Sequence, residues 1–298
     1  MKVPVVFIIF KRIDTTKKVF KLINYYKPDK LYLIADGPKV IDDNNKCSEV
    51  RNFIEDNIDW DCELIKVYSE TNLGCAKRVQ TGLDYVFENE EMAIILEDDT
   101  LPDPSFFNFC EELLERYKDD KRVAHISGCN LLSNAINFKE SYCFSSIVNI
   151  WGWATWKRAW NNYDINMPSW DNEAKESFIS KWCQDRKSLK GIRKMFDLHC
   201  NNIDPWTWDY QWVYACWKMN GLSVVPSRNL VSNLGIGPDA SNTKSPVSVK
   251  MHPSTLDAIH FPLTHPLLER NTDFETKYYR ESHLPLIRRI KTRIKSFL

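Results

Sequence analysis

The sequence predicts an α/β fold in which helices flank a mostly parallel central sheet. Short apolar runs alternate with stretches of helical periodicity through the first half of the chain. Each run is apolar at odd and even positions alike, as in strands that are covered on both faces. Polar residues with turn chemistry follow the runs directly. A β-α-β-α-β order of this kind gives parallel strands joined by right-handed crossovers.

The elements follow in a regular order. Buried strands are predicted at residues 3–10, 31–35, 62–68, 93–96 and 123–127. Residues 14–16 (Asp-Thr-Thr) have the composition of a helix N-cap. Helical spacing then runs through residues 19–23, 47–58, 77–87 and 106–114. His125 falls inside a strand, and we interpret it as a core histidine rather than a ligand.

Composition excludes several classes of protein. The 298 residues include 40 basic and 40 acidic ones, so the chain has no overall field for a polyanion, and nucleic acid is not expected as a partner. The nine cysteines are scattered without a CxxC pair, which disfavours a disulfide framework or a zinc site and fits a reducing cytosol. Residues 1–10 lack the features of a signal peptide, and no apolar run is long enough to span a membrane. We expect a cytoplasmic protein.

Three adjacent acids, Glu97, Asp98 and Asp99, follow the fourth predicted strand. Adjacent carboxylates repel one another, which is costly unless a cation or a polar ligand lies there. In open α/β sheets, ligands bind at the carboxyl ends of the strands. The functional interpretation is a divalent cation held by Asp99, with Asp98, that in turn holds phosphate oxygens. The alternative is a solvated acidic turn that caps the next helix.

Other polar residues are expected at the same edge of the sheet. Two basic residues follow the first strand, and Asp36 ends the second strand before a Gly-Pro turn. The loop 72–74 (Asn-Leu-Gly) opens a helix that carries Lys77 and Arg78. Basic residues there suit a phosphate at the helix N-terminus, although basic residues in first turns are also commonly solvated.

The order of these features resembles that of a GT-A glycosyltransferase. They are the basic residues after the first strand, Asp36, the 72–74 loop and the acids at 97–99. The branch is the one related to the N-acetylglucosaminyltransferase I group and to bacterial family-2-like enzymes, and the resemblance covers residues 3–243. It implies a GT-A (Rossmann-like) fold, a nucleoside-diphosphate sugar donor, most simply a UDP-sugar, and Mn²⁺ or Mg²⁺ bridging the diphosphate.

The resemblance also assigns residues. It puts Lys11 and Arg12 near the base or phosphates, Asp36 near the uracil, and Asp98 near the ribose or sugar. It makes Asp99 the metal ligand, joined by Asn242 where related enzymes often have a histidine. The donor-binding residues that it implies are Phe10, Lys11, Arg12, Asp36, Asn72, Gly74, Lys77, Arg78, Glu97 and Asp98.

The second half supplies a catalytic base. Attack by an acceptor hydroxyl needs a carboxylate on the opposite face of the sugar, and one opposed base gives inversion by a single displacement. Asp209 lies among Trp206, Trp208 and Trp212, and burial among aromatic rings raises the pKa of a carboxyl group. We therefore predict Asp209 as the base. Asp204 is the rival, and the alternatives for Asp209 are a helix N-cap or a buried partner of Lys157 or Arg158.

Tryptophans mark the expected acceptor side. Trp153, Trp156 and Trp160 have the i, i+3, i+7 spacing of one helical face, which favours core packing for the last two. Trp151 and Trp153 flank Gly152, and we expect partly exposed rings on which a sugar could stack. Residues 171–200 are polar with helical periodicity and predict a helical insertion.

The C-terminal part contains a loop and a tail. Residues 229–243 are rich in Gly and Asn and predict a mobile loop that orders over the donor. Residues 284–298 carry five basic residues and no acid, with apolar residues at helical spacing. That pattern is a basic amphipathic helix suited to an anionic membrane, or else a helix packed on the domain with its basic face exposed.

These observations predict a metal-assisted, inverting glycosyltransferase with a glycan or lipid-linked glycan acceptor, peripherally bound to the inner face of the cytoplasmic membrane. Polysaccharide or lipopolysaccharide biosynthesis is the expected setting. We expect a glycosyltransferase domain over 1–243, with halves 1–130 and 131–243, and an extension over 244–298. The alternatives are a sugar-nucleotide nucleotidyltransferase, disfavoured because no Gly-rich loop follows the first strand, and a non-catalytic carbohydrate-binding protein of the same fold.

Overall fold

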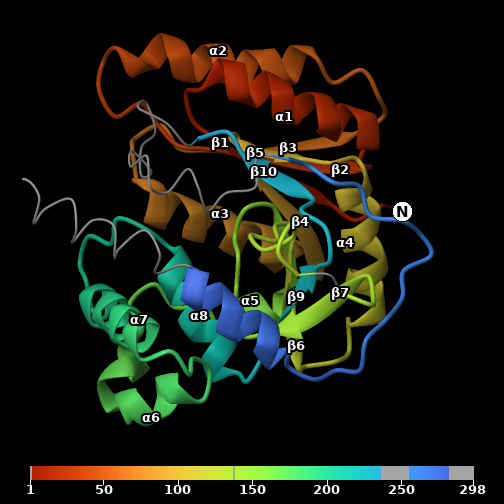
Figure 1. The fold of residues 1–298 in the computed structure, drawn as a ribbon. Helices are drawn as coiled ribbons and strands as arrows, with labels where there is room; N and C mark the ends of the chain where they lie inside the picture. Colours follow the sequence, from red (N-terminus) through yellow and green to blue (C-terminus); the bar gives the residue numbers. More distant parts are fainter. Residues whose placement is uncertain (1, 137, 236–254, 282–298) are drawn as a thin grey trace, which may run out of the picture.

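The computed structural model describes residues 2–136, 138–235 and 255–281. One eight-stranded sheet in the order β3-β2-β1-β4-β8-β6-β9-β7 runs through the molecule (Figure 1). Its strands are β1 Val5–Ile9, β2 Lys30–Ala35, β3 Glu63–Tyr68, β4 Met92–Glu97, β6 Val123–Ser127, β7 Tyr142–Ser145, β8 Trp153–Trp156 and β9 Leu222–Pro226. β3, β2, β1 and β4 are parallel neighbours, as are β6 and β9, whereas β8 and β7 run antiparallel to their neighbours. The predicted α/β fold with a mostly parallel sheet is confirmed.

Helices cover both faces of this sheet. α1 and α2 lie on one side of the first strands, and α3 lies on the other side (Figure 1). α4 packs on β4, β6 and β8, and α7 packs between α6 and α8. The helices are α1 Ile13–Tyr26, α2 Asp43–Asp56, α3 Cys75–Asn89, α4 Ser105–Arg116, α5 Lys157–Trp160, the 3₁₀ helix η1 Pro168–Asn172, α6 Lys175–Ser180, α7 Arg186–His199 and α8 Asp209–Lys218.

The first half of the chain folds as its pattern predicts. All five residues of β1 are buried, because helices cover both faces of the strand, and this is why its sequence shows no alternation. The N-cap prediction for residues 14–16 is wrong by one turn. α1 begins at Ile13 with Arg12 as its N-cap, and the buried Thr16 hydroxyl donates to the Arg12 carbonyl oxygen at 2.7 Å.

The second half differs at the tryptophans. The predicted helical face through Trp153, Trp156 and Trp160 is wrong, since Trp153–Trp156 is strand β8 and only Lys157–Trp160 is helical. β8 is inserted between β4 and β6, so both of its edges are paired, α4 packs on it, and all four of its residues are buried. The helical insertion predicted over 171–200 is confirmed by α6 and α7.

A second, two-stranded sheet lies at the end of β4. β10 (Val231–Asn233) pairs antiparallel with β5 (Thr100–Pro102), the strand that follows the acids. The mobile loop predicted at 229–243 is therefore wrong for residues 231–233, and residues 236–243 lie outside the described part of the chain. Residues 284–298 also lie outside it, and within the part that is described no helix is both long and apolar enough to cross a membrane.

Candidate functional site

The acids at the end of β4 share one counter-ion. Arg12 follows β1, which is the parallel neighbour of β4, so its side chain reaches the same edge. Its guanidinium donates to Asp98 Oδ1 and to Asp99 Oδ2, each at 2.7 Å. The Asp98 side chain is 3% exposed and that of Asp99 is 13% exposed. One cation thus serves two carboxylates, and the third acid of the triplet, Glu97, makes no salt bridge in the described residues.

The remaining negative charge has an electrostatic cost. Burial raises the pKa of Glu97, and the nearby charges of Asp99, Asp98 and Asp209 raise it further. Burial also raises the pKa of Asp98, although Arg12 and the Phe10 N–H, which donates to Asp98 Oδ2 at 3.1 Å, oppose the rise. Excess negative charge in a buried, low-dielectric environment favours a positively charged ligand at this edge of the sheet.

A glycine lets the chain close over Asp99. The Leu234 N–H donates to the Asp99 carbonyl oxygen at 2.7 Å, just after β10 pairs with β5. A Cβ at Gly235 would lie 2.0 Å from Asp99 Oδ2 and 2.9 Å from Arg12 Nη1. Only a residue without a side chain fits here, so Gly235 lies directly against the ion pair of Arg12 and Asp99.

The donor set fits a hard divalent ion that brings its own ligands. Asp99 uses Oδ2 for Arg12, and Oδ1 has no hydrogen-bond partner among the described residues. Mg²⁺ is commonly bound by one or two carboxylates plus phosphates and water. The described residues contain no cluster of three or more His, Cys, Asp or Glu side chains that could hold a metal alone, and Asn242 lies outside them. The residues present therefore suit a metal–phosphate complex rather than a metal bound by protein alone.

Asp36 clamps the loop that opens α3. Its Oδ1 accepts from the Gly37 and Leu73 N–H groups at 2.9 Å, and its Oδ2 accepts from the Gly74 N–H at 3.0 Å. The Asn72 side chain donates to the Gly37 carbonyl oxygen at 2.8 Å. Asp36 thus fixes the turn of the 72–74 loop, and its predicted contact with uracil stays a prediction.

The basic residues of this edge separate into two kinds. Lys11 pairs with Asp43 at 2.7 Å, and Lys77 points to solvent. Arg78 is only 6% exposed, and its guanidinium makes no hydrogen bond or salt bridge with any described residue. Burial lowers its pKa, although the charge of Asp36 opposes the fall. A buried cation without a hydrogen-bond partner is costly, which points to an anionic or polar ligand for Arg78. The sequence alone does not distinguish Arg78 from Lys77, because they are adjacent.

Asp209 lies near enough to the triplet for its charge to act on Glu97. It is the first residue of α8, it accepts a hydrogen bond from the Thr207 hydroxyl, and burial raises its pKa. Its charge acts on Glu97 at the end of β4 and on Cys75 at the start of α3. The structure thus brings Asp209 together with the β4 acids, although the two lie in opposite halves of the sequence.

The structure disfavours two alternative roles for Asp209, as the N-cap of a helix and as the ion-pair partner of Arg158. Trp208, not Asp209, is the N-cap of α8. Arg158 donates instead to the backbone carbonyls of Tyr117, Lys118 and Asp120. Asp204 is exposed in the turn before α8, as expected of a turn residue.

The predicted sugar platform at Trp153 is wrong. The Trp153 ring is fully buried and stacks on His125 at 5.3 Å and on Trp208 at 5.4 Å between centroids. The reason is the β8 insertion, which turns the ring into the layer between the sheet and α8. Gly152, at φ 59°, is overlaid by Val231, and Trp151 is half-buried. The exposed tryptophan of this half is Trp206, at 51%.

His125 is confirmed as a core histidine. Its Nε2 donates to the Asn149 carbonyl oxygen at 2.9 Å, and its Nδ1 accepts from the Trp212 indole N–H at 3.1 Å. Burial lowers its pKa to about 4. The ring is therefore neutral near pH 7 and holds α8 against β6.

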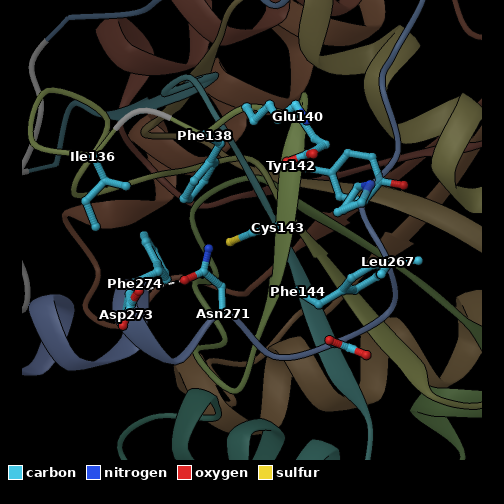
Figure 2. Close-up of a pocket in the computed structure, with 13 residues that line it drawn as sticks. Ile136, Phe138, Glu140, Tyr142, Cys143, Phe144, Leu267, Asn271, Asp273 and Phe274 are labelled. Atoms are coloured by element: carbon cyan, nitrogen blue, oxygen red, sulfur yellow. Dashed lines mark hydrogen bonds between the residues drawn. The ribbon is translucent and has the colours of Figure 1, made fainter.

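A separate cavity of about 480 Å³ opens at the far end of the sheet, between edge strand β7 and residues 266–274 (Figure 2). Phe138 and Phe274 form one side of it, and Tyr142 and Phe144 of β7 form another. None of the predicted site residues lines this cavity, and three strands lie between β7 and β4 in the sheet order. The cavity is thus distinct from the acid edge.

Comparison with known proteins gives little further identification. No family model and no curated protein matches this sequence. Among solved structures, UDP-glucose pyrophosphorylase complexed with UDP-glucose is similar at 12% identity and a TM-score of 0.33, over 54% of this chain and 79% of that chain. HddC from Yersinia pseudotuberculosis, complexed with GMP-PN, is similar at 10% identity and a TM-score of 0.34, over 53% of this chain and 80% of that chain. At these values the likeness assigns neither a family nor an activity to this chain.

Proposed function

We propose that this protein is a GT-A-type glycosyltransferase that moves a sugar from a UDP-sugar to a hydroxyl group of a glycan or glycolipid acceptor, with inversion. The observation that supports the proposal is the proximity of Asp209 to the acids of β4, where its charge raises the pKa of Glu97. A diphosphate-binding edge and a carboxylate base on the other side of one site are what a single displacement requires.

The donor end of the site is built from β1, β2 and β4. Arg12 and the unpartnered Arg78 supply positive charge for a diphosphate or a base carbonyl, and Phe10, Lys11, Asp36, Asn72, Gly74, Lys77, Glu97 and Asp98 complete the proposed donor site. Asp99, with Asn242, would hold Mn²⁺ or Mg²⁺. When bound, such an ion acts as a Lewis acid that stabilises negative charge on the diphosphate.

The transfer step follows from the opposed carboxylate. The acceptor hydroxyl oxygen forms a bond to the anomeric carbon, the bond from that carbon to the diphosphate oxygen breaks, and the hydroxyl proton passes to Asp209. The Thr207 hydroxyl, which donates to Asp209 Oδ1, orients the carboxylate. A pKa raised by burial makes Asp209 a stronger proton acceptor than an exposed aspartate.

The acceptor and cellular setting are proposed on the sequence alone. Trp151 and Gly152 stay proposed acceptor-side residues, and Trp153 can act there only by packing beneath them. A lipid-linked glycan on the inner face of the cytoplasmic membrane, reached through residues 284–298, is the proposed acceptor. The domain division at residue 243 stays a prediction as well.

The experiment compares two aspartates of one segment. Asp209→Asn should lower UDP release from a UDP-sugar by about 100-fold or more, because it removes the general base, while UDP affinity measured by calorimetry with Mn²⁺ changes by less than about twofold. Asp204→Asn, at an exposed position five residues earlier, is the matched control and should leave both unchanged.

Three other outcomes lead elsewhere. Undiminished turnover in Asp209→Asn contradicts the assigned base. Pyrophosphate release from UTP and a sugar 1-phosphate, without UDP release, supports the nucleotidyltransferase alternative. Glycan binding without turnover by the parent protein supports the binding-protein alternative.

A further inference from the structure

The outward face of α7 is strongly basic. Lys187, Lys190 and Lys194 are exposed and lie three and four residues apart, so they share one helical face, which Arg186 borders. Residues 181–198 contain six basic and two acidic residues, although the whole chain has no net charge. Positive charge is therefore concentrated on this helix, which lies at the periphery of the molecule beside α6 (Figure 1).

The lysines of this face form no ion pair with any residue that the structure describes. The ion pairs of this region join Arg193 to Glu176 and Asp197, and Lys175 to Asp197. Within the described ranges, Arg186, Lys187, Lys190 and Lys194 make no salt bridge. Like charges on adjacent turns repel one another, so this arrangement costs stability until an anion approaches.

Apolar side chains continue the same surface. Leu198 follows Lys194 by four residues on the exposed face of α7. The loop between α7 and α8 then exposes Ile203 at 91% and Trp206 at 51%. We name the set Lys187, Lys190, Lys194, Leu198, Ile203 and Trp206 the α7 surface.

We infer that the α7 surface binds the headgroup region of an anionic lipid bilayer. Lysines attract anionic headgroups, and exposed Leu, Ile and Trp side chains beside them enter the boundary between headgroups and acyl chains. A nucleic acid would use the lysines but would leave Ile203 in water. The combination of charge with protruding aliphatic and indole side chains is what selects a bilayer as the partner.

The position of this surface relates it to the proposed site. His199, the last residue of α7, is close enough to Asp209 for the carboxylate to act on the pKa of the imidazole. The helix that carries the α7 surface therefore ends near Asp209. The inference itself goes beyond the proposed function, since it needs neither a nucleotide nor residues 284–298.

The test is sedimentation of the full chain with vesicles, without nucleotide. Vesicles of phosphatidylcholine containing about one-third phosphatidylglycerol should bind the parent protein, and pure phosphatidylcholine should bind it weakly. Replacing Lys187, Lys190 and Lys194 with Ala should weaken binding about tenfold or more. The control replaces three exposed lysines of α1 and α2, Lys18, Lys21 and Lys46, with Ala, which changes net charge equally and should alter binding by less than about twofold.

The apolar part has its own control. Ile203→Ser should weaken vesicle binding about threefold, because it removes an inserting side chain, whereas Ile41→Ser, at a residue 84% exposed near the start of α2, should not. Residues 284–298 stay intact in every variant. Equal losses in the two lysine triples, unchanged binding in the α7 triple, or RNA binding by a parent that ignores vesicles would each overturn the inference.

Discussion

Two regions differ in how they hold buried polar groups: the acid edge, which is the triplet 97–99 with Arg12 and Arg78, and the aromatic layer of His125, Trp153 and Trp212. In the aromatic layer, the buried His125 has a partner on each ring nitrogen and stacks on Trp153. At the acid edge, Arg12 must serve two carboxylates, and Arg78 has no partner among the described residues.

The difference separates stability from ligand binding. A layer whose rings interlock and whose buried histidine is hydrogen-bonded through both ring nitrogens contributes to the free energy of unfolding, although the Trp153 indole N–H has no hydrogen-bond partner among the described residues. An edge whose buried charges are unbalanced costs free energy, and a protein retains such charges where a ligand completes them. Substitutions in the layer should therefore change stability, and substitutions at the edge should change the response to ligands.

The largest expected effect is Trp153→Ala. Removing a fully buried indole that stacks on two other rings should lower the free energy of unfolding by about 4 kcal/mol. Trp206→Ala, at an exposed tryptophan of the same half, should cost less than about 1 kcal/mol. Urea denaturation measures both, and equal losses would contradict the assignment of Trp153 to the core and Trp206 to the surface.

The next largest expected effect is a loss of folding stability at acid pH, caused by His125. Its pKa of about 4 in the folded protein lies below the ordinary value of 6.5, so the unfolded chain takes up the proton more readily. This contribution to stability is complete above pH 6.5 and is lost as the pH falls toward 4, by about 3 kcal/mol.

His125→Gln isolates that contribution. Glutamine can still donate to Asn149 and accept from Trp212, but it does not titrate. The variant should lose less stability than the parent between pH 7 and pH 4, as measured by urea denaturation at each pH. Parallel curves for the two proteins would show that His125 is not the titrating group.

The sequence predicts the acid edge better than the aromatic layer because the two depend on different ranges of information. Apolar runs such as those of β1 and β4 indicate, from neighbouring residues alone, that a strand is buried on both faces. The acids follow β4 directly in the chain. The helical phase of Trp153, Trp156 and Trp160 is real in the sequence. Pairing of β8 between β4 and β6 overrides it, and no local pattern encodes that pairing.

Within the site, the sequence could not predict the direction in which each side chain points. Lys77 and Arg78 are equivalent by composition, and only the packing of α3 turns one outward and the other inward. The contact of Gly235 with Asp99 likewise joins segments far apart in the chain. The raised pKa of Asp209 could be predicted from the aromatic residues on either side of it in the sequence, whereas its role as a base stays a prediction.

The smallest of the three effects tests the edge itself. Arg12→Met keeps the aliphatic packing but leaves Asp98 and Asp99 without their counter-ion, which should cost about 2 kcal/mol, less than a fully buried pair because Arg12 is about one-third exposed. Millimolar Mg²⁺ or Mn²⁺ should raise the melting temperature of this variant more than that of the parent, because a divalent ion takes the place of the guanidinium. Arg122→Met, which breaks the exposed pair with Asp120, is the control and should cost less than about 0.5 kcal/mol with no added response to metal. If the ions shift the Arg12 and Arg122 variants equally, the acids at the end of β4 do not form a cation site.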